Sequence, residues 1–284
     1  MGFDGPDERD LIETVTRMLA EDVGSGDLTA SLVDPAQQAS ATIVTRQPMT
    51  QAGRPWVDEI YRRLDDDVSL RWEYADGNSV AAGETLCALS GPARALLTGE
   101  RAALNILQTL SATATATAIY VAAVADTGCT LLDTRKTIPG LRLAQKYAVR
   151  CGGGSNHRIG LHDAILVKEN HIQSAGGITE ALAGARAVSP GVLIEIEVEN
   201  ADQLNEALAA GARRILLDNF DSEQLKAAVQ QNRQHDRPAV LEASGNVSID
   251  TVAEIAATGV DYISIGALTK NIHAVDLSMR FDDD

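Results

Sequence analysis

From about residue 128 onward, short apolar runs alternate with helix-like segments at a regular period. Six runs finish in polar or glycine positions, at Asp133, Lys168, Glu197, Asp218, Ser244 and Gly266. The intervals between these positions are 35, 29, 21, 26 and 22 residues. Strand–helix–strand repeats of this length form right-handed crossovers and a parallel sheet, and a barrel is their natural closure. Six strands where a closed barrel has eight mean that the barrel is incomplete or that two strands escape the pattern.

The N-terminal part of the chain has a different texture. Residues 10–20 have apolar side chains at helical spacing and predict a helix with one buried face. Residues 41–90 show short alternating runs broken by glycines, which predict antiparallel strands joined by turns. We predict a helix over residues 93–125, including the run SATATATA, whose small side chains suit a helix packed closely against a neighbour.

Composition excludes several classes of function. The 284 residues are 45% hydrophobic, which is enough for a substantial core, but only 4% aromatic. The net charge of −16 repels nucleic acid and anionic membranes, so an anionic ligand needs a local basic pocket. The N-terminus has no basic region, and we see neither a secretion signal nor a long uncharged apolar span. Three cysteines without CxxC spacing suggest neither a disulfide framework nor a zinc site, and we expect a cytoplasmic protein.

Charged side chains gather where the predicted strands end. Because the carboxyl ends of parallel strands meet at one mouth of a barrel, these residues should converge there. Arginine forks suit carboxylate or phosphate groups, and neighbouring carboxylates suit Mg²⁺ shared with a substrate phosphate. The glycine-containing turns SGN and GAL let backbone amides approach a phosphate monoester. The sequence thus predicts a site for a phosphorylated polyanion, formed by Arg135, Lys136, Lys168, Glu197, Asp218, Ser244, Gly245 and Gly266.

The segment 151–171 (CGGGSNHRIGLHDAILVKENH) is the densest in chemical groups. His157 and Arg158 precede an apolar strand that Lys168 follows, so both basic ends can face one pocket. The glycine triplet before them is equally compatible with a flexible loop. A metal site of His157, His162 and His171 is disfavoured, since their spacings fit no familiar zinc pattern.

Other strand-end residues have simpler explanations that the sequence leaves open. Asp133 and Asp218 could each cap a following helix. The alternating Glu195, Glu197 and Glu199 share one side of their strand, which fits a barrel interior or a solvated edge. Lys168 could form a Schiff base, as in barrel aldolases. By default, Arg101 would be an arginine on a helix surface.

Taken together, the motifs of this chain resemble the quinolinate phosphoribosyltransferases. The resemblance runs in order from about residue 21 to 281 and covers eight motifs at compatible spacings. These are EDVGSGDLT, GERAALNILQ, LLDTRKTIPGLR, KYAVRCGGGSNHRIGLHDAILVKENH, EIEVEN, LLDN, LEASGN and GVDYISIGALTK. One departure is SGNVS, which lacks the second glycine that some members carry after SG.

The resemblance implies an α/β fold of the type II phosphoribosyltransferases. An incomplete (β/α) barrel would carry the chemistry, and an N-terminal α/β sandwich domain would include the chain end. We place the sandwich domain at residues 1–111 plus 270–284 and the barrel domain at residues 112–269. A homodimer is implied, with Arg101 shared across subunits.

The same resemblance implies the reaction and its residues. Phosphoribosyl pyrophosphate would react with quinolinate, with decarboxylation, to give nicotinate mononucleotide, pyrophosphate and CO₂ in de novo NAD biosynthesis. Lys136, Glu197 and Asp218 would be catalytic, with Glu197 and Asp218 holding Mg²⁺. The substrate-binding residues would be Arg101, Arg135, His157, Arg158, Lys168, Ser244, Gly245, Asn246, Gly266, Ala267 and Leu268.

Four alternatives remain at this point. Molybdenum-system proteins of similar fold and nicotinate phosphoribosyltransferases without decarboxylation are close in class, but the full cationic set favours a dicarboxylate substrate. A barrel aldolase would need Lys168 but not the carboxylates and arginines together. A phosphate-binding scaffold would have no need for both substrate subsites.

Overall fold

A computed structural model describes residues 5–282, so residues 1–4 and 283–284, at the outer limits of the predicted sandwich domain, lie outside the described part. The chain forms two compact units. Unit 1 comprises Met1–Ala118, Thr137–Gly153 and Leu268–Asp284, and unit 2 comprises Ile119–Lys136 and Gly154–Ala267. Each unit is described by itself.

Unit 1 contains a four-stranded antiparallel sheet that includes the end of the chain. The last strand pairs with the first, with Ala41 opposite Phe281 and Thr45 opposite Leu277. Residues 277–281 therefore share a sheet with the N-terminal strands. In spatial order the strands are β12 (Leu277–Phe281), β1 (Gln38–Thr45), β5 (Thr85–Pro92) and β3 (Ser69–Trp72).

One part of the sequence prediction for unit 1 is wrong. Residues 41–90 are not strands throughout, because α2 (Arg54–Leu64) lies between β1 and β3. The glycine-rich surroundings hid a helix that starts with proline in its first turn and buries Trp56, Ile60 and Tyr61 on one face. The remaining elements of the unit are α1 (Glu8–Asp22), η1 (Ala30–Leu32), β2 (Met49–Thr50), β4 (Ser79–Val80), α3 (Ala93–Ala123), α4 (Arg142–Cys151) and α10 (Ala267–Lys270).

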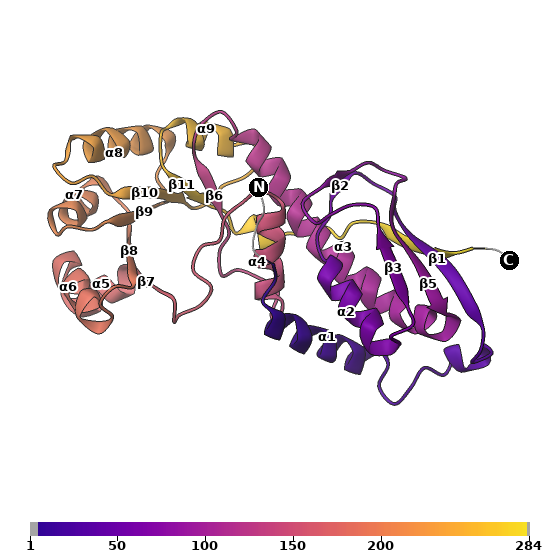
Figure 1. Ribbon diagram of the computed structural model, residues 1–284. Coiled ribbons are helices and arrows are strands. Elements are labelled where there is room, and N and C mark those ends of the chain that lie inside the picture. Colours follow the sequence, from indigo (N-terminus) through magenta and orange to yellow (C-terminus); the bar gives the residue numbers. More distant parts are fainter. Residues whose placement is uncertain (1–4, 283–284) are drawn as a thin grey trace. The chain divides into compact units, whose positions relative to one another are not determined.

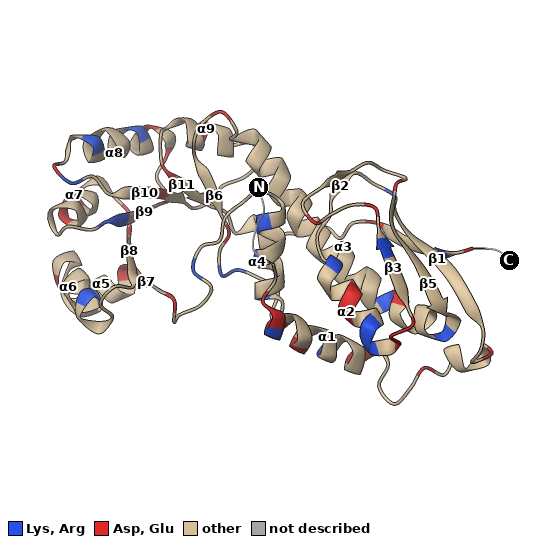
Figure 2. Cartoon of the chain, in the orientation of Figure 1, with Lys and Arg blue, Asp and Glu red and all other residues tan. Residues whose placement is uncertain are grey.

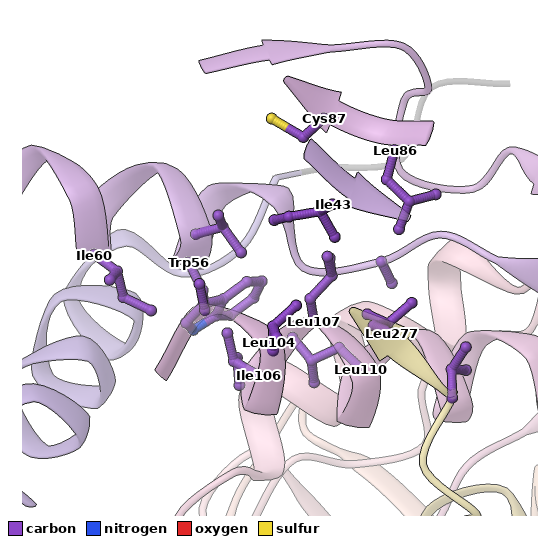
Figure 3. Packing of buried hydrophobic residues seen from close by; sticks show 14 of the residues in the cluster. Ile43, Trp56, Ile60, Leu86, Cys87, Leu104, Ile106, Leu107, Leu110 and Leu277 are labelled. Carbon is purple, nitrogen blue, oxygen red and sulfur yellow. The ribbon is translucent and has the colours of Figure 1, made fainter. Parts of the chain in front are cut away.

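Helix α3 forms the centre of the core of unit 1. Leu104, Leu107 and Leu110 are buried beside Trp56 and Ile43 (Figure 3). The helix continues through SATATATA, which confirms the helical prediction for that run. Length and composition alone would allow α3 to cross a membrane, but many of its residues lie in the hydrophobic core of unit 1.

Unit 2 contains the predicted parallel sheet. Each of the six apolar runs forms a strand, and the strands pair in the order β6 (Thr130–Leu132), β11 (Tyr262–Ser264), β10 (Val240–Ser244), β9 (Arg214–Asp218), β8 (Leu193–Val198) and β7 (Ala164–Val167). The crossover helices lie outside the strands in Figure 1 and are α5 (Glu169–Ala175), α6 (Ile178–Val188), α7 (Ala201–Ala209), α8 (Ser222–Gln234) and α9 (Val252–Ala257).

The sheet of unit 2 is an open barrel, as predicted. Its two end strands are β6 and β7, and the segment before β7 contacts β6 through a parallel bridge between Leu132 and Ser155. Helices α7 and α8 are capped at their N-termini by Asn200 and Asp221, whose side chains accept hydrogen bonds from the backbone N–H three residues later. The capping residue of α8 is therefore Asp221, which leaves Asp218 available at the strand end.

The predicted domain boundary at residues 111 and 112 divides the chain differently from the compact units. Residues 137–153, which include α4, belong to unit 1, and α3 continues beyond the predicted boundary to Ala123, with its residues up to Ala118 in unit 1. Because α3 runs through the predicted boundary, a boundary placed in the sequence does not coincide with one drawn from spatial contacts. The predicted boundary stays a prediction.

Gly152 packs closely against helix α3 in unit 1. It follows α4, and a Cβ at this position would lie 2.4 Å from the backbone oxygen of Ala114 on α3. We expect Gly152→Ala to lower the free energy of unfolding by about 1–3 kcal/mol, because backbone must move to relieve the overlap. Urea unfolding followed by circular dichroism measures this change.

Gly184→Ala is the matched control. Gly184 lies inside α6, where an added Cβ would meet nothing within 4 Å. This substitution should leave stability unchanged or raise it by up to about 1 kcal/mol, because alanine favours the helix. Equal effects of the two substitutions would contradict the packing argument.

Candidate functional site

The predicted site residues of unit 2 lie where its strands end. Lys168 follows β7, Glu197 is near the end of β8, and Asp218 and Ser244 close β9 and β10 and lie opposite each other in register. Arg135 and Lys136 follow β6 after a short interval. Figure 2 shows charged residues on and beside these strands, in a sheet whose other positions are mostly apolar.

Four of these residues interact electrostatically, and we call Lys136, Lys168, Glu197 and Asp218 the mouth cluster. The Nζ of Lys168 lies 2.5 Å from Oε2 of Glu197, whose side chain is only 14% exposed. Burial raises the pKa of Asp218, the charge of Glu197 raises it further, and Lys168 and Lys136 oppose both. Two carboxylates and two ammonium groups therefore share one small region, as the sequence predicted.

The two predicted arginines of unit 2 also lie close together. Burial lowers the pKa of Arg158, and the positive charge of Arg135 lowers it further. The Nη1 of Arg158 donates to the backbone oxygen of Ala164 at the start of β7. Like charges held near each other favour an anion that neutralises both.

The predicted SGN turn is supported by a residue that the sequence analysis did not single out. Asn219 has a φ of 57°, and its Nδ2 donates to Oδ2 of Asp218 at 2.8 Å. A Cβ at Gly245 would lie 2.1 Å from Oδ1 of Asn219, so only glycine fits there. Asn246 also has a positive φ, of 50°. The LLDN motif contained the signal, since asparagine tolerates the left-handed conformation better than most residues.

The other predicted turn depends on a small residue in the same way. A Cβ at Gly266 would lie 3.0 Å from Cδ of Lys136, so the lysine stem passes directly over the glycine. Ala267 begins the short helix α10, and Leu268 is fully buried. Leu268 therefore presents no side-chain surface to a ligand.

Asp133 does not cap a helix. It is fully buried at the end of β6, and its carboxylate accepts from Nδ2 of Asn156 at 2.6 Å and from the backbone N–H of His157 at 2.9 Å. Asp133 thus fixes the loop that carries His157 and Arg158. The neighbouring Gly152 packs tightly on α3, so a purely flexible loop does not describe this glycine.

His157 contacts two buried glutamates beneath the mouth. Its Nε2 lies 2.9 Å from Oε2 of Glu195 and 3.4 Å from Oε1 of Glu242. Burial lowers the pKa of His157, but hydrogen bonds and charges from both glutamates outweigh this and raise it to about 9. Arg214 binds both glutamates from the other side. Neither Glu242 nor Arg214 was predicted, although each is a charged residue inside an apolar strand.

The three alternating glutamates of β8 occupy different depths. Glu195 is buried, Glu197 is half-buried and Glu199 is exposed. Glu195 therefore points into the barrel interior, and Glu199 is a solvated residue, so each of the two explanations left open by the sequence applies to one glutamate. A cluster with the geometry of metal ligands does occur among the described residues, but it consists of His157, Glu195 and Glu242 and not of three histidines.

Arg101 is the predicted site residue that belongs to unit 1. It lies on α3 with its side chain 58% exposed, 3.7 Å from a carboxylate oxygen of its neighbour Glu100. Its environment within this unit is that of a helix-surface arginine.

Family models match nearly all of the chain. The model of the quinolinate phosphoribosyl transferase N-terminal domain matches residues 27–111, and that of the C-terminal domain matches residues 113–280. The chain belongs to the quinolinate phosphoribosyltransferase family. The family named by the eight sequence motifs is thus confirmed.

Individual relatives agree. The chain is 41% identical to the probable nicotinate-nucleotide pyrophosphorylase [carboxylating] of Bacillus subtilis, over 95% of this chain and 92% of that one. It is 40% identical to the corresponding enzyme of Mycobacterium leprae, over 94% and 95% of the two chains. The nicotinate-nucleotide pyrophosphorylase structure from Francisella tularensis matches with a TM-score of 0.93 and 43% identity, over 99% of both chains.

One runner-up class shares only the fold. Human nicotinic acid phosphoribosyltransferase matches with a TM-score of 0.66 but 15% identity. The quinolinate phosphoribosyltransferase family model therefore separates the chain from this neighbour, and the similarity to the human enzyme is a similarity of architecture.

The ionisation of Glu242 generates a prediction on stability. Burial opposes its charge, but hydrogen bonds and charges from His157 and Arg214 hold its pKa below the ordinary value of 4.5. A carboxyl with a lowered folded pKa stabilises the fold above its unfolded pKa, and this contribution is lost as the pH falls below about 4.5. Glu242→Gln should flatten the loss of stability in that acid range. At neutral pH it should cost about 3–5 kcal/mol, because Arg214 loses a buried partner.

Chemical unfolding at a series of pH values from neutral down to about pH 3 tests this. Glu254→Gln is the control, since Glu254 is exposed on α9 and should not change the acid slope. A slope that stays steep in Glu242→Gln would show that other carboxyls account for the acid sensitivity.

Proposed function

We propose that the mouth of unit 2 is the active site for the reaction of the quinolinate phosphoribosyltransferase family. The chain transfers phosphoribosyl from phosphoribosyl pyrophosphate to quinolinate with decarboxylation. The products are nicotinate mononucleotide, pyrophosphate and CO₂, and the step belongs to de novo NAD biosynthesis. The observation that supports this placement best is the contact of Lys168 with Glu197 at 2.5 Å beside Asp218, since cations and carboxylates meet at one strand edge.

The cations of the site fit a dicarboxylate. Arg135 and Arg158 lie close enough for their charges to interact, and Lys168 stands at the end of the strand that follows Arg158. Guanidinium forks bind carboxylates through two parallel N–H bonds. We assign the carboxylates of quinolinate to Arg135, Arg158 and Lys168, with His157 beneath them and Arg101 supplied from outside unit 2.

The SGN and GAL turns fit the 5-phosphate of the second substrate. Gly245 and Gly266 leave room where a Cβ would strike Asn219 or Lys136, so backbone amides can approach a phosphate closely. The missing second glycine of SGNVS is compensated here by Asn246, which adopts a positive φ itself.

The carboxylates of the mouth cluster fit Mg²⁺. Glu197 raises the pKa of Asp218, as expected for two carboxylates held near each other, and a hard divalent cation stabilises such a pair. Glu197 and Asp218 would hold the ion, whose chemistry when bound is to stabilise negative charge on the pyrophosphate group.

The residues of the chain favour charge separation at C1 of the ribose. Cleavage there places positive charge on the sugar and negative charge on the pyrophosphate. Lys136 stabilises the leaving group, and the two carboxylates stabilise the cationic sugar. No covalent nucleophile is required, and alignment of two substrates can itself contribute up to about 7–11 kcal/mol. Lys168 does not suit a Schiff base, since its Nζ donates to Oε2 of Glu197 and a Schiff base needs that nitrogen free to attack a carbonyl carbon.

The central experiment incubates the purified chain with quinolinate, phosphoribosyl pyrophosphate and Mg²⁺, and follows nicotinate mononucleotide and pyrophosphate. Arg135→Ala and Lys168→Ala should abolish quinolinate use, whereas Asp218→Ala should weaken binding of phosphoribosyl pyrophosphate or raise the Mg²⁺ requirement. Calorimetry with each substrate separates these effects. Unchanged binding of both substrates in all three variants would overturn the site assignment.

Substrate selectivity gives a further prediction. Nicotinate, with one carboxylate, should have a kcat/KM at least about 30-fold below that of quinolinate, because an unpaired buried cation costs about 2 kcal/mol or more. Steady-state kinetics with both acids at equal concentrations measures the ratio. Comparable turnover of nicotinate would exclude a pocket that needs both carboxylates.

We further propose that the active enzyme is a homodimer in which Arg101 enters the site of the partner. Exposed leucines of unit 1 support a buried interface there, since Leu28 and Leu32 are 87% and 86% exposed. Leu97, four residues before Arg101, is 38% exposed and lies on the same face of α3. In a two-fold dimer, each subunit gives and receives the same contact.

Subunit mixing tests the shared site. Arg101→Ala and Lys168→Ala should each be nearly inactive alone, but a heterodimer has one site with both lesions and one site with neither. Random exchange makes about half of the dimers mixed, so up to about a quarter of the wild-type activity should return. Native mass spectrometry verifies that heterodimers are present. If they form without activity, Arg101 acts in its own subunit or outside the chemistry.

A further inference from the structure

Arg214, Glu195, Glu242 and His157 form a continuous set of contacts inside the barrel, which we call the buried column. Each glutamate binds Arg214 with one oxygen and faces His157 with the other. The Nε of Arg214 lies 2.9 Å from Oε1 of Glu195, and Nη2 lies 2.6 Å from Oε2 of Glu242. The glutamates are 2% and 0% exposed. The column therefore holds two negative charges almost out of water.

The column starts well below the mouth. Arg214 is the first residue of β9, whereas Asp218 of the mouth cluster is its last. The Arg214 guanidinium lies over the ring of Tyr262, 4.6 Å from its centre. Because alternate residues of a strand share one face, Arg214 and Asp218 lie on the same side of β9 at opposite ends. The column thus connects the amino ends of the strands with the loop that carries His157.

The second ring nitrogen of His157 completes this connection. Its Nδ1 accepts from the backbone N–H of Arg158 at 2.7 Å, while Nε2 faces the glutamates. A hydrogen on Nδ1 would oppose that N–H, so this contact requires the neutral ring, whereas the carboxylates favour the protonated one. The neutral ring with its hydrogen on Nε2 satisfies both contacts at once. The Nε2–H toward Glu195 exists in both forms, but only the neutral ring accepts from the backbone N–H of Arg158, so the anchoring of that backbone requires it.

We infer that Glu195 and Glu242 are positioning residues for quinolinate, which hold the His157 ring so that it fixes the backbone at Arg158. The inference rests on the proposed function, because Arg158 is there a ligand of the substrate carboxylate. Because Nδ1 of His157 contacts the backbone of Arg158 and Nε2 contacts Glu195, His157 influences substrate binding by positioning Arg158. Asp133 holds the same loop through the backbone N–H of His157, so the loop is anchored at two successive amides.

Metal binding is a different use of the same three ligands, since ligand atoms of His157, Glu195 and Glu242 lie within 4.8 Å of one another. One carboxylate oxygen of each glutamate, Oε1 of Glu195 and Oε2 of Glu242, already binds Arg214. A metal ligand at His157 would have to be a nitrogen without hydrogen, but Nδ1 already accepts from the backbone N–H of Arg158 and Nε2 carries the hydrogen in the neutral ring. The structure therefore favours the column over a metal site.

The first test separates binding from turnover. In Glu195→Gln, one oxygen cannot accept from both Arg214 and His157, so the KM for quinolinate should rise about tenfold or more, as expected when a binding group is displaced. The KM for phosphoribosyl pyrophosphate should change less than about twofold. Glu199→Gln is the matched control, since Glu199 directly follows β8 and is exposed, and it should leave all constants unchanged. Glu242→Gln should raise the KM for quinolinate by a smaller factor, because Glu242 lies farther from Nε2 of His157 than Glu195 does.

A double-mutant cycle shows whether the glutamates act through the histidine. In a His157→Gln background, Glu195→Gln should no longer raise the KM for quinolinate. A rise of equal size in both backgrounds would overturn the positioning role, because the glutamate would then act by another route. Where Glu195→Gln does not fold, Glu242→Gln provides the same cycle.

Imidazole NMR of the ligand-free protein makes the test independent of the proposed function. The five histidines should give one Nε2–H protected from solvent exchange, absent in His157→Gln and shifted in Glu195→Gln. Absence of that signal overturns the column even if the enzyme is active. An inactive wild-type chain that retains it overturns the proposed function alone. Stoichiometric metal that is lost in Glu195→Gln would assign the three ligands to a metal site instead.

Discussion

The pairing of opposite charges inside the open barrel is the constraint on which the site depends. A chain with a net charge of −16 has to hold cations for an anionic substrate, and two of them lie beside carboxylates. Lys168 pairs with Glu197 at the mouth, and Arg214 pairs with Glu195 and Glu242 below it. Buried charges are stable only when they are paired and hydrogen-bonded, so the two layers of charge support each other through the same strands.

The period of two along a strand explains this layering. Residues 214, 216 and 218 of β9 point to one face, and they carry a cation, an apolar side chain and a carboxylate in turn. On β10, Glu242 and Ser244 stand opposite Leu216 and Asp218. One strand thus contributes to the interior at its start and to the site at its end. The spacing between the layers is set by the backbone and does not depend on loop conformation.

Much of the fold could be predicted from the sequence, because repeats and motifs carry regular signals. All six parallel strands and the helical SATATATA run were recovered. Helix α2 was missed, since proline and glycine near its start resemble turn signals. The mouth cluster followed from strand ends, but Glu242, Arg214 and Asn219 did not. Their importance comes from partners on other strands, and strand order cannot be obtained from the spacing of one chain. The predicted roles of the site residues and of Mg²⁺ stay predictions.

The pairing of β12 with β1 has a consequence for how the protein is made. The first strand of unit 1 leaves the ribosome well before its edge partner, which consists of residues 277–281. The strands β7 to β11 of unit 2 are synthesised in between. Because a sheet cannot pair with a strand that does not yet exist, the sheet of the N-terminal unit stays open at β1 until β12 has been synthesised. An exposed strand edge invites intermolecular pairing, so nascent chains are most vulnerable to aggregation before residues 277–281 emerge.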